Sequence, residues 1–321
     1  MSVNRIPGKR HPACILATCC IPWNEDGSFA ADTFRRSVRT LLAEFTQDVY
    51  VFGTAGEGYA VSESQFDQIT RVFREETAQP EVRAMVGVIS LSLPTIVERI
   101  ERARELGFRS FQISLPSWGA LTGREVAVFF RETCGRFPDC NFLHYNLPRA
   151  KRILLAEDYV TLANKHPNFV ATKHGGDSMH QCLGLLAKVP QLQHFLTETS
   201  YGYASLSGRC ALLASVSSMN FTAGRQYFEA GQKGDTATLL EMQKELNSLT
   251  GELIAMGLAD AHMDGAFDKV FCRLHDPKFP LRLLPPYSGL KLETYKRMAA
   301  LVRDKYPRWF PARPARSQVV N

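Results

Sequence analysis

The stretch Phe169-Val170-Ala171-Thr172-Lys173-His174-Gly175-Gly176-Asp177 carries the strongest structural signal in this chain of 321 residues. A short apolar run ends in a lysine and is then broken by two glycines, which is typical of a buried strand that delivers an amine to the mouth of a site. Two other segments have the same form. Val49-Tyr50-Val51-Phe52 runs into Gly53-Thr54-Ala55-Gly56-Glu57-Gly58, and Asn141-Phe142-Leu143-His144 runs into Tyr145-Asn146-Leu147-Pro148.

Runs typical of strands alternate with helical patterns over about two thirds of the chain. Several of the strand runs are continuously apolar, as strands of a parallel sheet are when helices cover both faces. We expect strands near residues 14–20, 49–52, 82–89, 110–115, 141–145, 168–173, 193–197 and 210–216, and helices near residues 33–45, 62–77, 94–106, 122–134, 156–165, 178–186 and 201–206. Ser62, three residues before Gln65, predicts a capping box at the start of the second of these helices.

Eight strand–helix alternations predict an α/β fold, a closed (β/α)8 TIM barrel, over residues 1–224. A doubly wound sheet is the alternative, but it needs a nucleotide-binding glycine loop after the first strand, and Thr18-Cys19-Cys20-Ile21-Pro22-Trp23 offers none. After residue 224 only helical patterns follow, near residues 226–230, 236–256, 265–274 and 290–305. We therefore expect a C-terminal helical domain over residues 225–321, with a mobile tail from residue 307.

Composition excludes several kinds of partner. The net charge of +6, from 38 Lys and Arg against 32 Asp and Glu, suits anionic metabolites. The basic residues are scattered, so we expect no nucleic-acid partner. No apolar run approaches the roughly 18 residues that span a bilayer, so we expect no membrane partner. The polar N-terminus without a signal-peptide core, and eight cysteines without a C-x-x-C pair, predict a reduced cytoplasmic protein.

In a TIM barrel the carboxyl ends of the strands share one face, so Thr54, Tyr145 and Lys173 are expected to meet at its mouth. A buried lysine is neutral more often than an exposed one, and a neutral amine forms an imine with a 2-oxo acid. A phenol beside that carbon transfers protons. The Thr54 hydroxyl and the backbone amides of the Gly53-Thr54-Ala55 loop would bind the substrate carboxylate. These residues predict Schiff-base chemistry on a 2-oxo acid.

Other polar residues are weaker candidates. His144, His174 and His180 are expected near the mouth but lack metal-ligand spacing, and imine chemistry needs no metal, so we expect neither a metal nor another cofactor. Asp264 and Asp268 lie four residues apart in a helical pattern and are interpreted as a solvated face or a cap. Trp309 and Phe310 lie in the expected tail, where packing against a neighbouring subunit is the favoured interpretation.

Over nearly its whole length the chain resembles the dihydrodipicolinate synthase and N-acetylneuraminate lyase family of class I aldolases. The resemblance rests on residues 17–22, Gly53-Thr54-Ala55-Gly56-Glu57, Tyr145-Asn146-Leu147-Pro148, residues 172–177 and Leu281-Arg282-Leu283-Leu284-Pro285. It implies a (β/α)8 barrel with a C-terminal helical domain, assembled as a homo-oligomer, a dimer or a tetramer of two dimers. It also implies Lys173 as the imine lysine, Tyr145 as the proton shuttle, and Thr54 with the Ala55 amide as carboxylate binders.

The departures from the family pattern concern the second substrate. Ala55 stands where a second hydroxyl residue is common, and Trp118 lies where synthases have a proton-relaying tyrosine. Ala150 occupies the expected position of a carboxylate-binding arginine, and Glu198 replaces part of a small glycine-containing turn. Trp118 and Glu198 thereby become candidate substrate-binding residues, Trp118 in its own or a neighbour's site. These departures argue against a lysine-biosynthesis synthase.

Three functions stay open at this point. The leading one is a class I lyase that cleaves or forms a carbon–carbon bond next to a pyruvate unit. The second is a dehydratase that uses the same imine to expel water from a 2-oxo-3-deoxy sugar acid. The third is a non-catalytic 2-oxo-acid-binding protein on an aldolase scaffold, since a fold alone does not establish catalysis.

Overall fold

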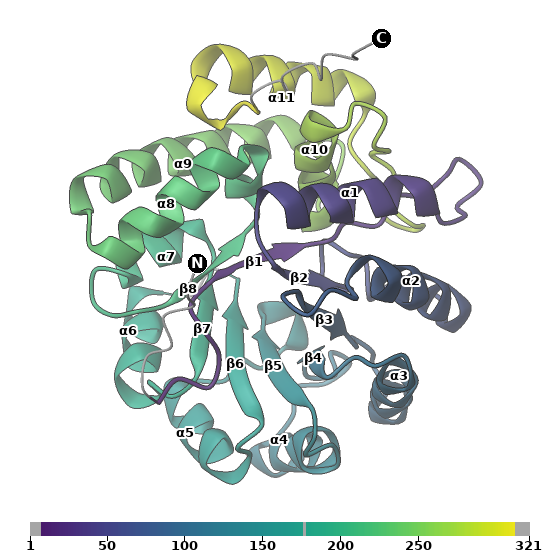
Figure 1. The fold of residues 1–321 in the computed structure, drawn as a ribbon, viewed down its shortest axis with the longest axis vertical. Coiled ribbons are helices and arrows are strands. Elements are labelled where there is room, and N and C mark those ends of the chain that lie inside the picture. Colours follow the sequence, from purple (N-terminus) through teal and green to yellow (C-terminus); the bar gives the residue numbers. More distant parts are fainter. Residues whose placement is uncertain (1–7, 176–177, 312–321) are drawn as a thin grey trace.

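Eight parallel strands form a closed barrel in chain order, with helices on its outside (Figure 1). The computed structural model describes residues 8–175 and 178–311. Each of the eight expected strand regions overlaps one strand of the barrel, so the predicted TIM barrel is confirmed. The strands are β1 (Ile15–Thr18), β2 (Asp48–Val51), β3 (Arg83–Gly87), β4 (Ser110–Ile113), β5 (Asn141–Asn146), β6 (Phe169–His174), β7 (Gln193–Leu196) and β8 (Ala211–Ala214).

Eleven α-helices and four short helical turns lie in the described part of the chain. The helices are α1 (Ala31–Glu44), α2 (Glu63–Glu76), α3 (Leu93–Glu105), α4 (Gly123–Phe130), α5 (Ala156–Lys165), α6 (Met179–Lys188), α7 (Glu198–Ala204), α8 (Phe221–Lys233), α9 (Thr236–Gly257), α10 (Asp264–His275) and α11 (Leu292–Lys305). The short turns are η1 (Arg131–Gly135), η2 (Pro148–Ala150), η3 (Val216–Met219) and η4 (Pro307–Trp309). The capping box predicted for Ser62 and Gln65 is confirmed at the start of α2.

Side chains alternate along each strand between the barrel interior and the helical layer. An apolar cluster fills the interior and is made of Cys14, Leu16, Tyr50, Met85, Leu143, Val170, Ala171, Phe195, Ala211 and Leu213. Tyr145 of β5 pairs in register with Lys173 of β6, which pairs with Phe195 of β7. This register places the phenol and the amine on the same side of neighbouring strands, above the apolar interior.

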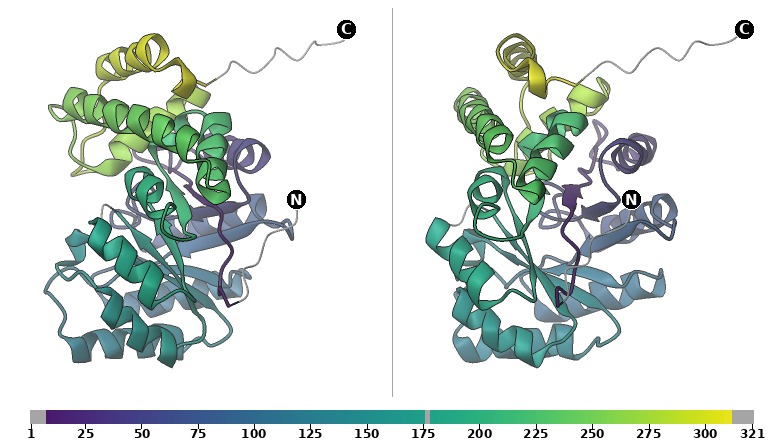
Figure 2. Two further views of the ribbon diagram at one scale, coloured as in Figure 1. Left: turned by 90° about the vertical axis from the view of Figure 1, so that its left-hand side faces the viewer. Right: turned by 60° about the vertical axis from the view of Figure 1, so that its left-hand side comes forward.

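The C-terminal helices form a layer at one side of the barrel, away from α3, α4 and α5 (Figures 1 and 2). Within this layer α9 packs on α7, α8 and α11, and α10 contacts η3, the turn that follows β8. α8 spans the boundary expected at residue 224, and the division into two domains there stays a prediction. No helix among residues 8–175 and 178–311 is long and apolar enough to cross a membrane.

The expected mobile tail from residue 307 is wrong for its first residues. Trp309 is fully buried, and its indole Nε1 donates to Glu245 Oε2 at 3.1 Å. Asn220 donates to the carbonyl oxygens of Arg308 and Phe310. Trp309 therefore packs within its own chain, because a large aromatic side chain gains more from burial than a short terminal segment loses in entropy. Residues 312–321 lie outside the described residues.

Candidate active site

Lys173 lies at the end of β6 and is almost fully buried, with 2% of its surface exposed. Its Nζ donates to Tyr50 Oη at 2.9 Å and to Gln112 Oε1 at 3.1 Å. The same atom lies 3.8 Å from the ring centroid of Tyr145 and 4.2 Å from that of Tyr50. The amine is thus held on a platform of two phenol rings, and its direct polar partners are neutral groups.

Burial lowers the pKa of Lys173 to about 7, and the negative charges of Asp268 and Asp264 only partly oppose that change. Desolvation penalises the ammonium form and leaves the neutral amine unpenalised. A large fraction of this amine is therefore unprotonated near neutral pH, as attack on a carbonyl carbon requires.

The loop after β2 lies directly against this amine. Its Thr54 hydroxyl shares a hydrogen bond of 3.4 Å with the Tyr145 hydroxyl. A Cβ on Gly53 would lie 2.5 Å from Tyr50 Cε2 and 3.3 Å from Lys173 Nζ, so only glycine lets the backbone approach this closely. The three predicted catalytic residues, Lys173, Tyr145 and Thr54, are therefore brought together with Gly53 at the mouth of the barrel.

The amides of this loop divide into two groups. Those of Glu57 and Gly58 close the turn, donating to Thr54 O at 3.1 Å and to Gly53 O at 3.2 Å. Within the described residues, the amides of Thr54 and Ala55 have no acceptor. Since Thr54 and Ala55 are both buried, two unused donors beside Lys173 suit an anionic ligand such as a carboxylate.

A buried ion pair fixes the loop to α10. Lys269 Nζ lies 2.6 Å from Glu57 Oε1, and both side chains are fully buried. Trp23 Nε1 donates to the same oxygen at 2.8 Å, and the Leu284 amide donates to Oε2 at 2.7 Å. These hydrogen bonds satisfy the buried Glu57 carboxylate, so its ion pair with Lys269 holds the loop at a fixed distance from α10.

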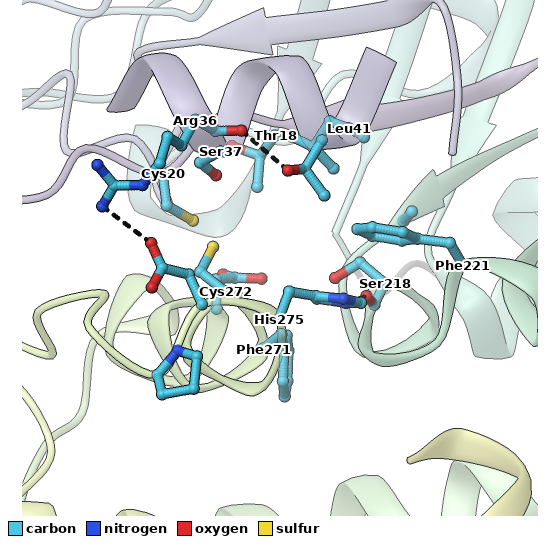
Figure 3. Close-up of a pocket in the computed structure, with 16 residues that line it drawn as sticks. Thr18, Cys20, Arg36, Ser37, Leu41, Ser218, Phe221, Phe271, Cys272 and His275 are labelled. Carbon is cyan, nitrogen blue, oxygen red and sulfur yellow. Dashed lines mark hydrogen bonds and ion pairs between the residues drawn. The ribbon is translucent and has the colours of Figure 1, made fainter. Parts of the chain in front are cut away.

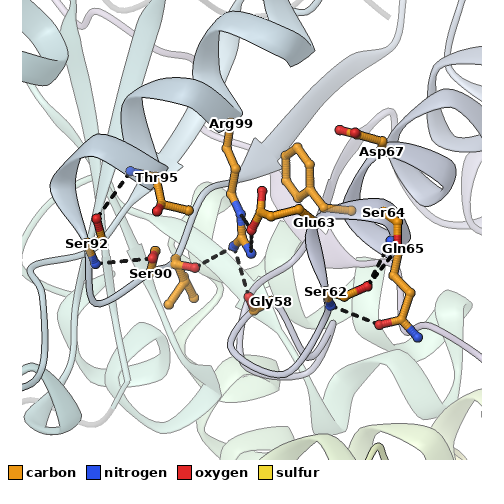
Figure 4. Close-up of polar contacts among 12 residues, drawn as sticks. Gly58, Ser62, Glu63, Ser64, Gln65, Asp67, Ser90, Ser92, Thr95 and Arg99 are labelled. Carbon is orange, nitrogen blue, oxygen red and sulfur yellow. Dashed lines mark hydrogen bonds and ion pairs between the residues drawn. The ribbon is translucent and has the colours of Figure 1, made fainter.

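A second anchor reaches the same end of the loop from α3, one residue after Glu57. Arg99 donates to the carbonyl oxygens of Gly58 at 3.2 Å and Ile89 at 2.6 Å (Figure 4). Its Nε and Nη2 both bind Glu63 Oε1, at 3.0 Å and 2.7 Å, which neutralises the guanidinium. The C-terminal end of the loop is thus held by two charged groups that do not themselves enter the site.

Tyr145 is followed by a turn that Asn146 stabilises. The Asn146 side chain donates to Leu154 O at 2.9 Å and accepts from the Leu154 amide at 3.0 Å. Burial raises the pKa of Tyr145 above its ordinary value, which keeps the phenol protonated near neutral pH. Ala150 in this turn is buried, and the neighbouring Arg149 forms a two-pronged ion pair with Asp264 at 2.9 and 3.1 Å.

The interpretation of Asp264 and Asp268 as a solvated face is wrong for Asp268. Asp268 is only 6% exposed, and Ser215 Oγ donates to its Oδ1 at 2.8 Å. Burial raises the pKa of Asp268 to about 7. A four-residue spacing places both carboxyls on one face of a helix, but it does not say what that face meets. Here the face meets the mouth of the barrel.

Two residues near Lys173, Tyr50 and Gln112, were missed by sequence reasoning, and Asp268 was assigned to the wrong environment. Tyr50 and Gln112 were included only in strand runs, although a polar residue in an otherwise apolar strand is a usable sign of an inward-facing site residue. Asp268 carried no such sign, because nothing in its local sequence connects α10 with β6.

Two predicted substrate-binding residues do not join this group. Trp118 lies in the loop after β4 with 83% of its surface exposed. Glu198 is buried at the start of α7, where its Oε1 accepts hydrogen bonds from the Ser215 amide at 2.7 Å and from the Ser217 amide and hydroxyl at 2.9 Å. That oxygen holds the turn after β8. Substrate binding by Trp118 and Glu198 stays a prediction.

The expected position of the histidines is also wrong. His144 and His174 are buried on the outer face of the barrel, because they alternate with the inward-facing Tyr145 and Lys173. His144 Nδ1 lies 2.8 Å from Tyr159 Oη of α5, and His180 on α6 is exposed. Within the described residues, no three His, Cys, Asp or Glu side chains gather closely enough to hold a metal ion.

A cavity of about 330 Å³ lies beside the mouth, between α1, α8 and α10 (Figure 3). Figure 3 shows the thiols of Cys20 and Cys272 close together at its wall. Thr18 and Asp268 contribute to its wall, whereas Lys173 and Tyr145 do not. The cavity therefore borders the site through Asp268, and the reacting groups lie outside it.

Comparisons with known proteins agree with this geometry. A model of the Dihydrodipicolinate synthetase family matches residues 11–302. N-acetylneuraminate lyase of Histophilus somni is 26% identical over 249 residues, which cover 76% of this chain and 84% of that protein. The 4-hydroxy-tetrahydrodipicolinate synthase of Thermosynechococcus vestitus is 25% identical over 177 residues, covering 55% of this chain and 59% of that protein.

Solved structures show the same fold. A prophage protein of the dihydrodipicolinic acid synthase family from E. coli K12, solved in complex with pyruvate, has a TM-score of 0.80 at 16% identity and covers 91% of this chain and 97% of its own. The protein CdNal from Clostridium difficile, solved in complex with mannosamine, has a TM-score of 0.78 at 17% identity. The match covers 90% of this chain and 97% of that protein.

Proposed function

The chain belongs to the dihydrodipicolinate synthetase family, whose relatives are named as lyases and synthases, and from that premise we propose that it is a class I lyase that forms a Schiff base with pyruvate or a related 2-oxo acid. One observation carries the proposal: a buried amine with a pKa of about 7 lies at the barrel mouth beside a protonated phenol. Two unused backbone amides on the neighbouring loop suit the carboxylate of such an acid.

The first step follows from these contacts. The neutral Nζ of Lys173 attacks carbon 2 of the 2-oxo acid, and Tyr145 gives a proton to the oxygen that leaves as water. The product is a protonated imine, in which carbon 2 is bonded to the lysine nitrogen. The Thr54 hydroxyl and the amides of Thr54 and Ala55 hold the carboxylate during this step. The imine then accepts electrons from the bond between carbons 3 and 4, which is how a carbon–carbon bond breaks or forms next to a pyruvate unit.

The direct test is intact-protein mass spectrometry after mixing with pyruvate and reducing with borohydride. We expect one adduct, absent in Lys173→Ala and present in the matched control Lys188→Ala, whose lysine is exposed on α6. Absence of an adduct with pyruvate and with longer 2-oxo acids would refute the proposal. Full turnover by Lys173→Ala would refute it as well.

Dehydration of a 2-oxo-3-deoxy sugar acid is the second candidate, because it uses the same imine and needs two groups that transfer protons. Asp268 and Tyr145 both lie near Lys173, as shown by their electrostatic and ring contacts with it. Product analysis separates the two reactions, since cleavage yields pyruvate and an aldehyde while dehydration leaves the carbon chain whole. Binding of 2-oxo acids without turnover, unaffected by Lys173→Ala, would favour a non-catalytic role.

We also propose that the second substrate differs from that of a lysine-biosynthesis synthase. Ala150, at the position expected for a carboxylate-binding arginine, is buried, and the adjacent Arg149 is paired with Asp264. A second substrate bearing a carboxylate would therefore compete with Asp264 for Arg149. A homo-oligomeric assembly and a cytoplasmic location complete the proposal, and size measurement in solution tests the former.

A further inference from the structure

Asp268 has no part in the imine-forming step, yet the fold holds it firmly beside the reacting lysine. Its neighbour Lys269 is tied to Glu57 by the buried ion pair. One turn earlier, a Cβ on Gly265 would lie only 3.3 Å from the carbonyl oxygens of Thr54 and Ala55, so the backbone of α10 passes close to the loop there. α10 is thus fixed to the same loop that lies against Lys173. The position of Asp268 is set as closely as that of the loop itself.

The Asp268 carboxyl lies at the part of the barrel mouth next to β8. Ser215, which donates to Asp268, follows β8 directly, and β8 pairs with β1 to close the barrel. Around the ring in chain order, β6 with Lys173 lies between β5 with Tyr145 and β8. The strand of the amine therefore lies between the strand that carries the phenol and the strand beside the carboxyl.

Asp268 and Lys173 are both buried at the mouth of the barrel. The charge of each influences the pKa of the other. Within the described residues, no ion pair of 4.0 Å or less joins them, in contrast to Lys269 and Glu57. The Asp268 carboxyl is therefore not engaged by the amine that would carry the substrate.

We propose that Asp268 is the acid–base residue that moves the proton at carbon 3 of a 2-oxo acid held as an imine on Lys173. The inference rests on the proposed function and deepens it. The Asp268 carboxylate takes a proton from carbon 3, and the electrons of that carbon–hydrogen bond form the double bond between carbons 2 and 3. The electrons of the carbon–nitrogen double bond move to nitrogen, which leaves a neutral enamine and a protonated Asp268. In the reverse direction the same proton returns to carbon 3.

The charges around Asp268 suit this cycle. Burial is the main cause that raises the pKa of Asp268, while the hydrogen bond from Ser215 lowers it. The negative charges of Asp264 and Glu198 raise this pKa further, and the positive charge of Lys173 lowers it. The negative charge of Asp268 also raises the pKa values of Tyr50, Tyr145 and Cys20. The imine carries a positive charge that the free amine lacks, so imine formation favours the carboxylate. The neutral enamine removes that charge and favours the acid.

This step is shared by the candidate reactions. After cleavage of a carbon–carbon bond the enamine must gain a proton at carbon 3, and before dehydration carbon 3 must lose one. Both reactions therefore require proton transfer at carbon 3, and this transfer can be measured with pyruvate alone.

The test measures two properties of one sample: the borohydride-trapped adduct, and exchange of the pyruvate methyl protons for deuterium, followed by proton NMR. We expect Asp268→Asn to keep the adduct and to lose exchange by about 100-fold, the scale of a missing acid–base group. The matched control is Asp304→Asn on α11, whose carboxyl is 63% exposed and paired with Arg303, away from the site. We expect it to exchange within about threefold of the parent enzyme.

Each other outcome overturns the inference at a different point. Exchange by Asp268→Asn at the rate of the parent enzyme refutes it and leaves the imine intact. Loss of both the adduct and the exchange in Asp268→Asn would show that Asp268 is needed for imine formation on Lys173, which also refutes a role confined to carbon 3. A parent enzyme that forms the adduct without exchange refutes it too, whereas a parent enzyme without any adduct refutes the proposed function first. Asp268→Ser provides the same comparison should the asparagine variant not fold.

Discussion

The pH dependence of imine formation is the sharpest consequence of the buried lysine. The pKa of Lys173 is lowered from 10.5 to about 7 by burial. At pH 7 about half of such an amine is neutral, against about one part in 3,000 for a lysine of ordinary pKa. The structure therefore raises the concentration of the reactive form by about three orders of magnitude.

The direction of the pH profile follows from the charge of the amine. Only the neutral form attacks, so the rate of imine formation rises about tenfold per pH unit well below the pKa and levels off about one unit above it. We expect the bend near pH 7. Asp268 raises the pKa of Lys173 by favouring the ammonium form, so Asp268→Asn should move the bend to lower pH.

The assay mixes enzyme and pyruvate in a quench-flow instrument from about pH 5.5 to about pH 9.5, a range that spans both pKa values considered. Borohydride stops each reaction, and the adduct is counted by intact mass. A rate that still climbs tenfold per unit above about pH 8.5 would refute the reasoning, because it would place the amine near its ordinary pKa. A bend that moves upward in Asp268→Asn would refute the electrostatic part.

Two further changes test how the loop after β2 is held. Lys269→Met should lower the free energy of unfolding by about 3–5 kcal/mol, because it leaves the Glu57 charge buried and unpaired. The control Lys305→Met removes the ion pair of Lys305 with Glu252, whose side chains are 58% and 36% exposed. Urea denaturation should show that this control lowers the free energy of unfolding by less than about 1 kcal/mol. Equal losses of stability in the two variants would contradict the argument. Gly53→Ala should reduce pyruvate trapping at least tenfold, about 1.4 kcal/mol, because its Cβ would overlap the Tyr50 ring; trapping at the parent rate would show that the loop moves freely.

Much of the fold followed from local patterns. Continuously apolar strand runs, the cap at Ser62 and the eightfold alternation with helices predicted the barrel that the structure confirms. The placement of Lys173, Tyr145 and Thr54 near one another also followed, because parallel strands put their carboxyl ends on one face. Trp309 shows the limit of such reasoning, since a short segment near the terminus was expected to be mobile and is buried.

The barrel, and the three residues at the ends of β2, β5 and β6, could be predicted from sequence patterns alone, because the alternation of side chains along a strand is a local property of each run of residues. The surroundings of the amine could not be predicted in this way. The charge state of Lys173 depends on how completely other elements exclude water from it. The position of Asp268 at the barrel mouth depends on the ion pair between Glu57 and Lys269. Desolvation and contacts between distant segments exist only once the chain has folded, so no local pattern encodes them.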